Sequence, residues 1–594
     1  MLFVVLIVLM VLSLIVIKSK IVSTPAGVLV IFMTLLIALP LVFFSDMLDI
    51  KYVGLFFITG CLALFVCGHI IAIKIGQKVF VKSKLFCNRQ LSVRVLAILI
   101  LLGFINPICN IYSHGFSLLD LVNLDRLTEM TKQFSWERYS DETTYSKLIQ
   151  FTLLFSYSAS IIGGFCFLFL KNVIHKLFCV ASVAPCFFIT VSQSTKMQMI
   201  VAVIFWISGL LIFVYTYNIK IRLSLRIIVG TLLAVVIFAV SIFLLSITRW
   251  NNKIDNLSIE KSKTSFIVNS IGSFFCFDHW FYNQIHGIDY STELLHNSTL
   301  YQLGTLHNIE NGVKVVFDEA IPAPSMEIFG RRLDECKYYA GKKYTIQFDV
   351  TSDEKPDSVR ISLVSYSSLP YGHFLLMMDS CSHIGLHTWH YSRTFCLDSN
   401  RICVQTPDII LSYSGVRYVE ITKFRIDTGS VAMPWINGGS NIFWHKDGLK
   451  YGVMTFFGVA NLLGIAERQP GVYRDFVYFG QNNEDLHTNV YTIFRMLIDD
   501  FGIVGALVFL FLLGFASAKA IEFIKKRKMI FLSQTFLVAV YSYVMWGFVA
   551  SIWAYTSILC AYGLAFIIFS ILQKPLHGDT WVTKITKKLK PKQK

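Results

Sequence analysis

The 594-residue sequence has few charged residues and lacks nucleotide-binding motifs. Only 15% of its residues are charged, whereas 55% are hydrophobic and the mean hydropathy is +0.60. This composition excludes a soluble globular protein. The sequence contains no Walker loop, no GxGxxG at a strand-to-helix turn and no DxD between strands. A cytosolic glycosyltransferase that uses nucleotide sugars is therefore disfavoured.

The sequence also lacks the cysteine and histidine spacing of a zinc site, and no CxxC occurs. Its 13 cysteines are scattered, and most lie in apolar stretches, where a thiol behaves as a small apolar residue. Cys336, Cys381, Cys396 and Cys403 differ, because they lie in a long polar segment. If that segment lies on the outer side of the membrane, oxidising conditions permit disulfides, and the sequence does not choose among the possible pairings of these four cysteines. We predict no metal and no cofactor.

Long apolar runs are the main positive feature. Eleven stretches approach or reach the ~20 residues with which a helix crosses a ~30 Å hydrocarbon core. They are residues 2–17, 26–44, 53–73, 93–112, 148–170, 177–191, 197–217, 227–245, 501–520, 531–550 and 557–572. Lys18 and Lys20 follow the first stretch, which favours a retained helix over a cleaved signal peptide. The sequence predicts an α-helical polytopic membrane protein with about 11 spans.

Basic residues indicate the orientation of these spans. If the stretches alternate in direction, the Lys-rich and Arg-rich linkers and the basic tail after residue 573 all fall on one side, which identifies the cytoplasm. The net charge of +16 is therefore mostly a topology signal. The long soluble segment lacks such an excess, so we predict no nucleic-acid partner.

Between residues 288 and 437 the hydrophobic period changes from helical to alternating. Residues 344, 346, 348 and 350 are apolar or aromatic, and the polar residues 345, 347 and 349 separate them. Turn residues separate several such stretches, which predicts a β-sandwich or jelly roll. We therefore divide the chain into residues 1–287, 288–437, 438–500 and 501–594. The segment at 416–435 resembles the last strand and exit of carbohydrate-binding-module jelly rolls.

The inserted domain is predicted to be extracytoplasmic. If both of its flanks crossed the membrane, it would instead be cytoplasmic, but polar residues between 269 and 283 make the first flank amphipathic. Aromatic side chains of the domain offer faces on which sugar rings stack, although most such residues form core. The stacking candidates are Trp389, Tyr391 and Trp435.

A charged cluster precedes the apolar stretch at 506–515. Arg495, Asp499 and Asp500 lie next to a hydrocarbon boundary, where charges are costly unless they face each other or a cavity. Such residues are functional candidates by default. Arg495 and Asp499 are four residues apart, so the plain alternative is an ion pair within one helix.

Residues 489–505 resemble, in spacing as well as type, a segment of the bacterial oligosaccharide repeat unit polymerases, the Wzy-type O-antigen polymerase family. Residues 266–278 and 450–458 look like two neighbouring motifs of that family. The resemblance implies a multi-pass enzyme of the bacterial inner membrane that polymerises undecaprenyl-diphosphate-linked repeat units at the outer face. Its implied partners are that lipid-linked oligosaccharide, membrane lipid, a chain-length regulator and a flippase.

The resemblance also implies roles for residues. The forked guanidinium of Arg495 would bind the departing diphosphate, and Asp500 matches an acidic position of the family. The catalytic candidates are Arg495, Asp500, Arg474, Asp475, His487 and Arg249. The substrate-binding candidates are Asn489, Tyr491, Thr492, Arg468, Lys196, Arg126 and Asp278.

Each candidate also has a plain interpretation. Lys196 and Arg249 are typical of residues at a membrane interface. Arg126 belongs to a segment of balanced charge that predicts an amphipathic surface helix, and Asp278 is typical of a helix cap. The loop residues Arg468 and Arg474 would carry charge for solubility alone.

Two other functions fit the same pattern. An O-antigen ligase would transfer glycan to a lipid A core acceptor instead. A lipid-linked oligosaccharide flippase or transporter predicts cations in the middle of several spans. A receptor anchored by its helices is a third, weaker interpretation, because an anchor needs fewer spans.

Overall fold

The structure is a computed structural model of the whole chain. It describes residues 2–43, 47–76, 85–121, 123–140, 149, 151–193, 195–219, 272–286, 298–300, 305–309, 312–317, 326–330, 343–365, 372–378, 380–385, 387–396, 408–412, 416–429, 449–465, 477–478, 487–488 and 492–575.

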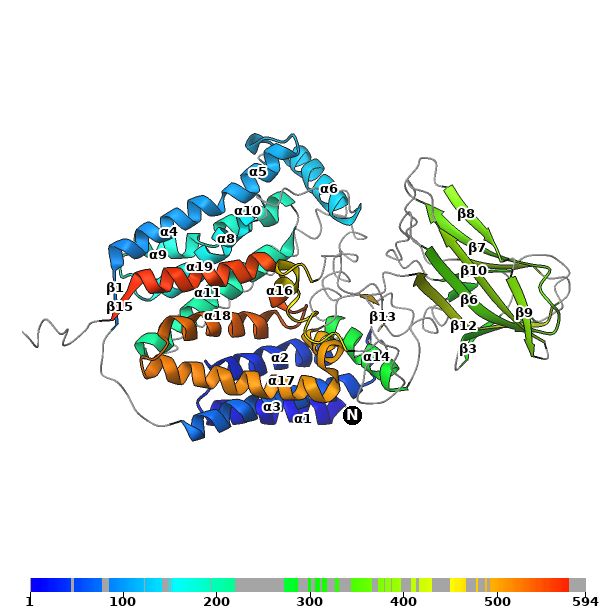
Figure 1. Cartoon of the computed structure of the whole chain (residues 1–594), viewed down its shortest axis with the longest axis horizontal. Helices are drawn as coiled ribbons and strands as arrows, with labels where there is room; N and C mark the ends of the chain where they lie inside the picture. Colours follow the sequence, from blue (N-terminus) through cyan, green and yellow to red (C-terminus); the bar gives the residue numbers. More distant parts are fainter. Residues whose placement is uncertain are drawn as a thin grey trace, which may run out of the picture.

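The described chain is mostly helical. The long helices are α1 (Leu2–Lys18), α2 (Pro25–Phe43), α3 (Val53–Ile75), α4 (Arg89–Gly103), α6 (Leu124–Ser140), α8 (Leu153–Phe167), α11 (Lys196–Tyr217), α14 (Gly272–His286), α17 (Ile493–Lys525), α18 (Ile530–Trp546) and α19 (Thr556–Leu572). Shorter helices are α5 (Ile105–Ser113), α9 (Val173–Ala181), α10 (Ala184–Gln193), α16 (Phe457–Leu462) and the 3-10 turns η2 (Leu118–Leu121) and η3 (Ile552–Ala554). The apolar helices lie side by side as one bundle (Figure 1).

Six helical stretches among the described residues are long and apolar enough to cross a membrane. They are Pro25–Val42, Val53–Ile75, Arg89–Ser113, Val173–Gln193, Met197–Tyr217 and Ile493–Lys525. Four predicted stretches coincide with shorter apolar helices, Phe3–Lys18, Leu153–Phe167, Ile530–Trp546 and Thr556–Leu572. The predicted stretch 227–245 lies outside the described residues. The protein is thus membrane-embedded, and six candidate spans lie among the described residues.

Helices α3 and α17 cross at two glycines. A Cβ atom on Gly68 would collide with the carbonyl oxygen of Phe511, and one on Gly514 would collide with that of Phe65. In hydrocarbon, such close backbone approach supplies the dispersion contacts that hold helices together. Next to this crossing, the buried His69 bonds through its Nδ1 to Ser517 Oγ at 3.0 Å.

The strands form two larger antiparallel sheets, which lie together beyond one end of the bundle (Figure 1). One sheet has the order β3-β4-β12-β6-β10-β9, and the other has the order β2-β5-β11-β7-β8. Their bounds are β2 Ser298–Leu300, β3 Thr305–Ile309, β4 Gly312–Val316, β5 Met326–Gly330, β6 Lys343–Ser352, β7 Ser358–Ser365, β8 Gly372–Met377, β9 Ser380–Gly385, β10 Thr388–Cys396, β11 Asp408–Ser412 and β12 Tyr418–Gly429. The inserted segment is therefore built from strands, as predicted.

Strand β6 shows why the alternating pattern was informative. Ile346, Phe348 and Val350 are fully buried on one face, as their period of two predicts. On the other face, Asp349 is also buried, because His390 Nδ1 and Lys423 Nζ lie 2.6 and 2.9 Å from its carboxylate oxygens. Polar cross-strand partners thus cover part of the face that the pattern marks as solvent-exposed.

The end of the bundle away from the sheets is closed by a short strand pair. Strand β1 (Leu85–Cys87), just before α4, pairs with β15 (Gln573–Pro575), just after α19 (Figure 1). Helix α19 begins at the opposite end, where Thr556 Oγ1 donates to Gly458 O at 3.3 Å. The start of α4 and the segment around residue 458 therefore mark the two ends of the bundle.

The glycine crossing predicts a sharp difference within one helix. Gly68→Ala should destabilise the protein by on the order of 1–3 kcal/mol, because the added methyl forces α3 and α17 apart. Gly60→Ala in the same helix meets nothing within 4 Å and should be neutral. Thermal unfolding of both variants in detergent measures this, and equal midpoints would contradict the close packing of α3 on α17.

Candidate functional site at the start of helix α17

The charged cluster of α17 is buried rather than exposed at a rim. Gly502 has φ 70°, which interrupts the helix and leaves Ile493–Asp500 as a short helical segment of its own. Every residue of this segment is buried, including Arg495 (7% exposed), Asp499 and Asp500. Its first residue is fixed to the end of α18, since Ile493 N donates to Gly547 O at 2.9 Å.

Arg495 lies between an aromatic ring and a carboxylate. Its Cζ is 4.7 Å from the centre of the Trp280 ring, on α14, and its Nε is 4.0 Å from Asp499 Oδ2. Stacking on Trp is the most favourable cation–π geometry, and it gains strength where water is excluded. Phe277 of α14 contacts Phe494 at 6.1 Å between ring centres, so α14 also packs on α17 through apolar rings. Arg495 is thus a buried cation with a fixed orientation.

Asp500 anchors the chain that returns from the β-region. Its two carboxylate oxygens accept hydrogen bonds from Met454 N at 2.9 Å and Thr455 N at 2.6 Å. The backbone carbonyls of Asp499 and Asp500 accept from Lys450 N and Tyr451 N. Asp500 therefore holds residues 450–455 on the first turns of α17, and the carboxylate near Arg495 is that of Asp499.

Asp278, on the flank that precedes the β-region, likewise accepts backbone N–H groups from a distant segment. Its Oδ2 accepts from Lys51 N and Tyr52 N at 2.8 and 2.7 Å, and its Oδ1 accepts from Gly54 N and Leu55 N at 2.7 and 3.2 Å. Gly54 and Leu55 lie in the first turn of α3, whose N–H groups have no partner within the helix, and Lys51 and Tyr52 lie just before it. Asp278 is therefore a helix cap supplied from a distant helix. Burial raises the pKa of Asp278, and the four N–H groups act in the opposite direction.

His279 fixes the same junction. Its Nε2 donates to Asp49 O at 2.7 Å, and Asp49 also forms a 2.7 Å ion pair with Lys51. Burial is the main reason that the pKa of His279 falls from 6.5 to about 4. The imidazole is therefore neutral at physiological pH.

The hairpin of β13 (Val477–Tyr478) and β14 (His487–Thr488) packs on α14. This places the backbone of His487, paired with Tyr478, beside the helix that carries Asp278 and Trp280. Thr492 is buried and immediately precedes α17. Three predicted residues, Arg495, Asp500 and Asp278, thus come together here with His487 and Thr492 on adjacent segments.

Other predicted residues lie elsewhere or outside the described part of the chain. Arg126 is exposed on α6 and forms a 2.9 Å ion pair with Glu129, as expected of a surface helix. Lys196 begins α11, and its side chain is outside the described residues. The remaining candidates outside the described residues are Arg249, Arg468, Arg474, Asp475, Asn489, Tyr491 and Trp435.

Two predicted stacking residues need correction. Trp389 is 9% exposed and Tyr391 is 3% exposed. They share the inward face of the sheet with Val350 and Phe348, and Tyr391 stacks on Phe348 at 5.9 Å. Both are core residues, so their ring faces are not open to a sugar. Cys381, one of the four cysteines in this region, is a free and exposed thiol.

Sequence reasoning missed Trp280 and underrated Asp499. Trp280 follows Asp278 and His279 directly, and a tryptophan beside charged residues in an amphipathic flank was the available signal. Comparison with models of protein families and with curated proteins finds no match to this chain.

The neutral His279 predicts an acid-dependent loss of stability. Between pH 6.5 and about 4, the unfolded imidazole binds a proton and the folded one does not, so the free energy of unfolding falls as pH falls. The contribution amounts to on the order of 3 kcal/mol across that window. Relative to wild type, His279→Gln should be less stable at pH 7.5, and the difference should shrink steadily toward pH 4.5.

Thermal midpoints of both proteins across this pH range measure the difference, and Asp278 and Asp49 are present in each. His383→Gln, which removes an exposed imidazole, is the matched control for the loss of a histidine. A wild-type advantage that stays constant or grows in acid would contradict a buried neutral imidazole.

Proposed function

We propose that the protein polymerises undecaprenyl-diphosphate-linked oligosaccharide repeat units at the outer face of the bacterial inner membrane. The observation that carries this proposal is the buried guanidinium of Arg495, stacked on Trp280 at the bundle end from which the β-region projects. A cation in a low-dielectric site that is fixed before the reaction is what a departing diphosphate requires. The segment that resembles the Wzy-type family contains this arginine.

In the proposed reaction, an acceptor sugar hydroxyl attacks the anomeric carbon of the growing chain. The new C–O bond forms as the bond to the lipid diphosphate breaks, and its electron pair stays with the diphosphate oxygen. Arg495 binds that oxygen through its forked N–H groups. We assign the hydroxyl proton to His487, whose backbone lies in β14 beside α14. Among the carboxylates described near Arg495, Asp278 and Asp500 accept backbone N–H groups and Asp499 faces the guanidinium.

The finer architecture belongs to the same proposal. We take the six-stranded and five-stranded antiparallel sheets as the two faces of a jelly-roll sandwich, inserted between residues 288 and 437. We also keep eleven spans, with the four shorter apolar helices and residues 227–245 added to the six clear ones. The β-region is then extracytoplasmic, and the end with β1 and β15 is cytoplasmic. This orientation agrees with the basic linkers.

A flippase and a ligase would each require a different position or role for the Arg495 cation. A flippase needs cations within the membrane along a transport path. A ligase would use the same diphosphate chemistry on another acceptor. The position of Arg495 at the end of the bundle supports an enzyme rather than a flippase. The molecule to which the glycan is attached in a variant strain distinguishes a polymerase from a ligase.

Arg495 variants test the proposal in the native host. Arg495→Ala should abolish polymer and accumulate single-repeat glycan attached to its normal acceptor, because loss of a preorganised charge lowers the rate by on the order of 100-fold or more. Arg495→Lys keeps the charge without the planar fork and should show short chains at reduced yield. Glycan gels read the ladder, and membrane immunoblots confirm equal protein abundance.

Arg360→Ala is the matched control, because this arginine is exposed on β7 and lies outside the candidate site. Its ladder should be unchanged. Polymer that accumulates on the lipid carrier in the Arg495→Ala strain would indicate a ligase, and repeat units trapped on the cytoplasmic side would indicate a flippase. A normal ladder would contradict the assignment of Arg495.

Deletion of residues 288–437 tests whether the sheets are accessory. The two flanks of the β-region are held on the helix bundle by the hydrogen bonds of Asp278 and Asp500, which do not involve the sheets. A short linker between the flanks should therefore leave the site around Arg495 assembled. We expect polymerisation to continue with an altered chain-length distribution on glycan gels. Complete loss of polymer, with normal protein abundance, would instead make the β-region part of the active machinery.

A further inference from the structure

A second cationic site lies at the other end of the bundle. A pocket of about 480 Å³ opens between the start of α4 and the segment that joins α8 to α9. It is lined by Arg89, Gln90, Val93, Arg94, Leu170, Lys171, Asn172 and His175. None of these lining residues is acidic, and three of them are permanent cations at neutral pH. The pocket lies just after β1, at the end away from the sheets (Figure 1).

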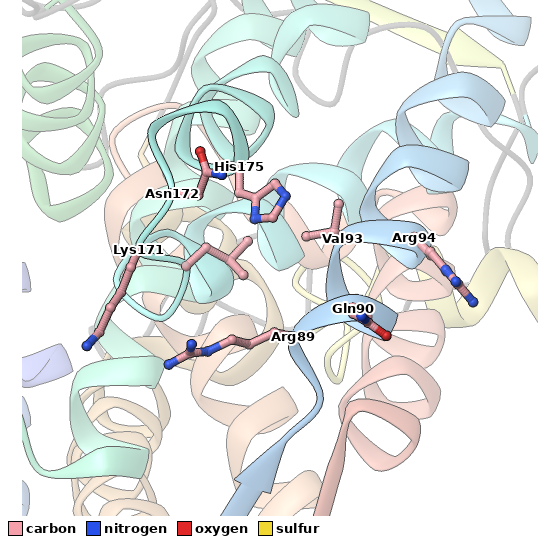
Figure 2. Close-up of a pocket in the computed structure, with 8 residues that line it drawn as sticks. Arg89, Gln90, Val93, Arg94, Lys171, Asn172 and His175 are labelled. Carbon is pink, nitrogen blue, oxygen red and sulfur yellow. The ribbon is translucent and has the colours of Figure 1, made fainter.

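The lining side chains come from two separate elements. Figure 2 shows Arg89 and Lys171 extending on one side of the pocket, with Arg94 on the other and His175 between the two elements. Arg89 has its Cζ 5.4 Å from the Phe169 ring, a contact that holds the guanidinium near the opening and leaves its N–H groups able to donate. The pocket thus has cationic donors from both elements.

Two helix N-termini add to this positive potential. Helix α4 begins at Arg89, capped by Asn88 Oδ1, which accepts from Leu91 N at 3.1 Å. Helix α9 begins at Val173, capped by Asn172 Oδ1, which accepts from Ile174 N at 2.9 Å. Each N-terminus carries about half a positive charge. Two helix ends and three cationic side chains without a lining carboxylate are a site for an anion with several oxygen acceptors.

Apolar surface adjoins the pocket directly. Val173 and Ile174 follow Lys171 and Asn172 and are strongly exposed, as is Leu177 on α9. Leu101, toward the far end of α4, is exposed as well. On a membrane-embedded helix these side chains face acyl chains. A soluble anion would leave this apolar surface uncovered, whereas a phospholipid places its headgroup at the cations and its acyl chains along α4 and α9.

We propose that this pocket binds the headgroup of an anionic glycerophospholipid of the bilayer. The phosphodiester accepts hydrogen bonds from Arg89 and Lys171, and Arg94 adds positive potential from the other side of the pocket. The acyl chains lie against Leu101, Val173 and Leu177. The site is separate from the start of α17 and does not depend on the chemistry proposed there.

The test uses the purified, delipidated full-length protein in neutral detergent and phosphatidylglycerol with a fluorescent tail. The triple variant Arg89→Gln, Arg94→Gln, Lys171→Gln should bind at least about tenfold more weakly, since each cation near an anionic lipid contributes about fivefold. Lys18→Gln, Lys74→Gln, Lys528→Gln removes the same charge from exposed positions outside the pocket and should bind as wild type does. Arg89→Lys, Arg94→Lys, Lys171→Arg should retain binding.

Three outcomes would overturn the proposal. They are equal binding by the two glutamine triple variants, equal affinity for phosphatidylcholine, and displacement of the lipid by inorganic phosphate or glycerol 3-phosphate as effectively as by unlabelled phosphatidylglycerol. The last outcome would make the pocket a soluble-anion site. Thermal midpoints of the triple variants, measured without lipid, separate lost binding from lost folding. Arg495→Ala should bind phosphatidylglycerol normally.

Discussion

The geometry around Arg495 depends on two buried carboxylates that accept backbone N–H groups. Asp278 fastens α14 to the start of α3, and Asp500 fastens residues 450–455 to α17. Burying a carboxylate is costly, and several N–H donors offset that cost only when their positions are fixed. Because these two anchors hold both flanks of the β-region, a large insertion can be accommodated without displacing the Trp280 ring from the guanidinium.

Local sequence patterns were sufficient to locate the helices and strands, but they could not predict contacts between distant segments of the chain. Length and apolarity located the helices, and the period of two located β6. A single polar residue in a flank already indicated a cap at Asp278, although the sequence could not say which helix it caps. The pairing of Arg495 with Trp280 joins segments on either side of the insertion, and no local period encodes such a contact. For the same reason, Trp389 and Tyr391 could not be assigned to core or surface from the sequence.

The bundle has cationic side chains at each end, and we propose that each set binds an anion. At the end near the β-region, a single guanidinium is buried against an aromatic ring, which suits a group whose charge develops in one place. At the opposite end, exposed cations and two helix N-termini line an open pocket beside apolar surface. An enzyme that draws a lipid-linked substrate from the bilayer, as proposed above, needs both a cation for the leaving group and stable binding in the membrane, and under the two proposals separate sites would supply them.

Equilibrium binding of undecaprenyl diphosphate to the purified protein tests the central claim most directly. The account predicts that Arg495→Gln weakens this binding by about tenfold or more, because a bidentate charge-assisted contact is lost from a buried site. Binding of uncharged undecaprenol should change little, and the Arg89, Arg94 and Lys171 triple variant should retain wild-type affinity for the diphosphate. Equal affinity of wild type and Arg495→Gln for undecaprenyl diphosphate would contradict the claim that this buried guanidinium holds the departing group.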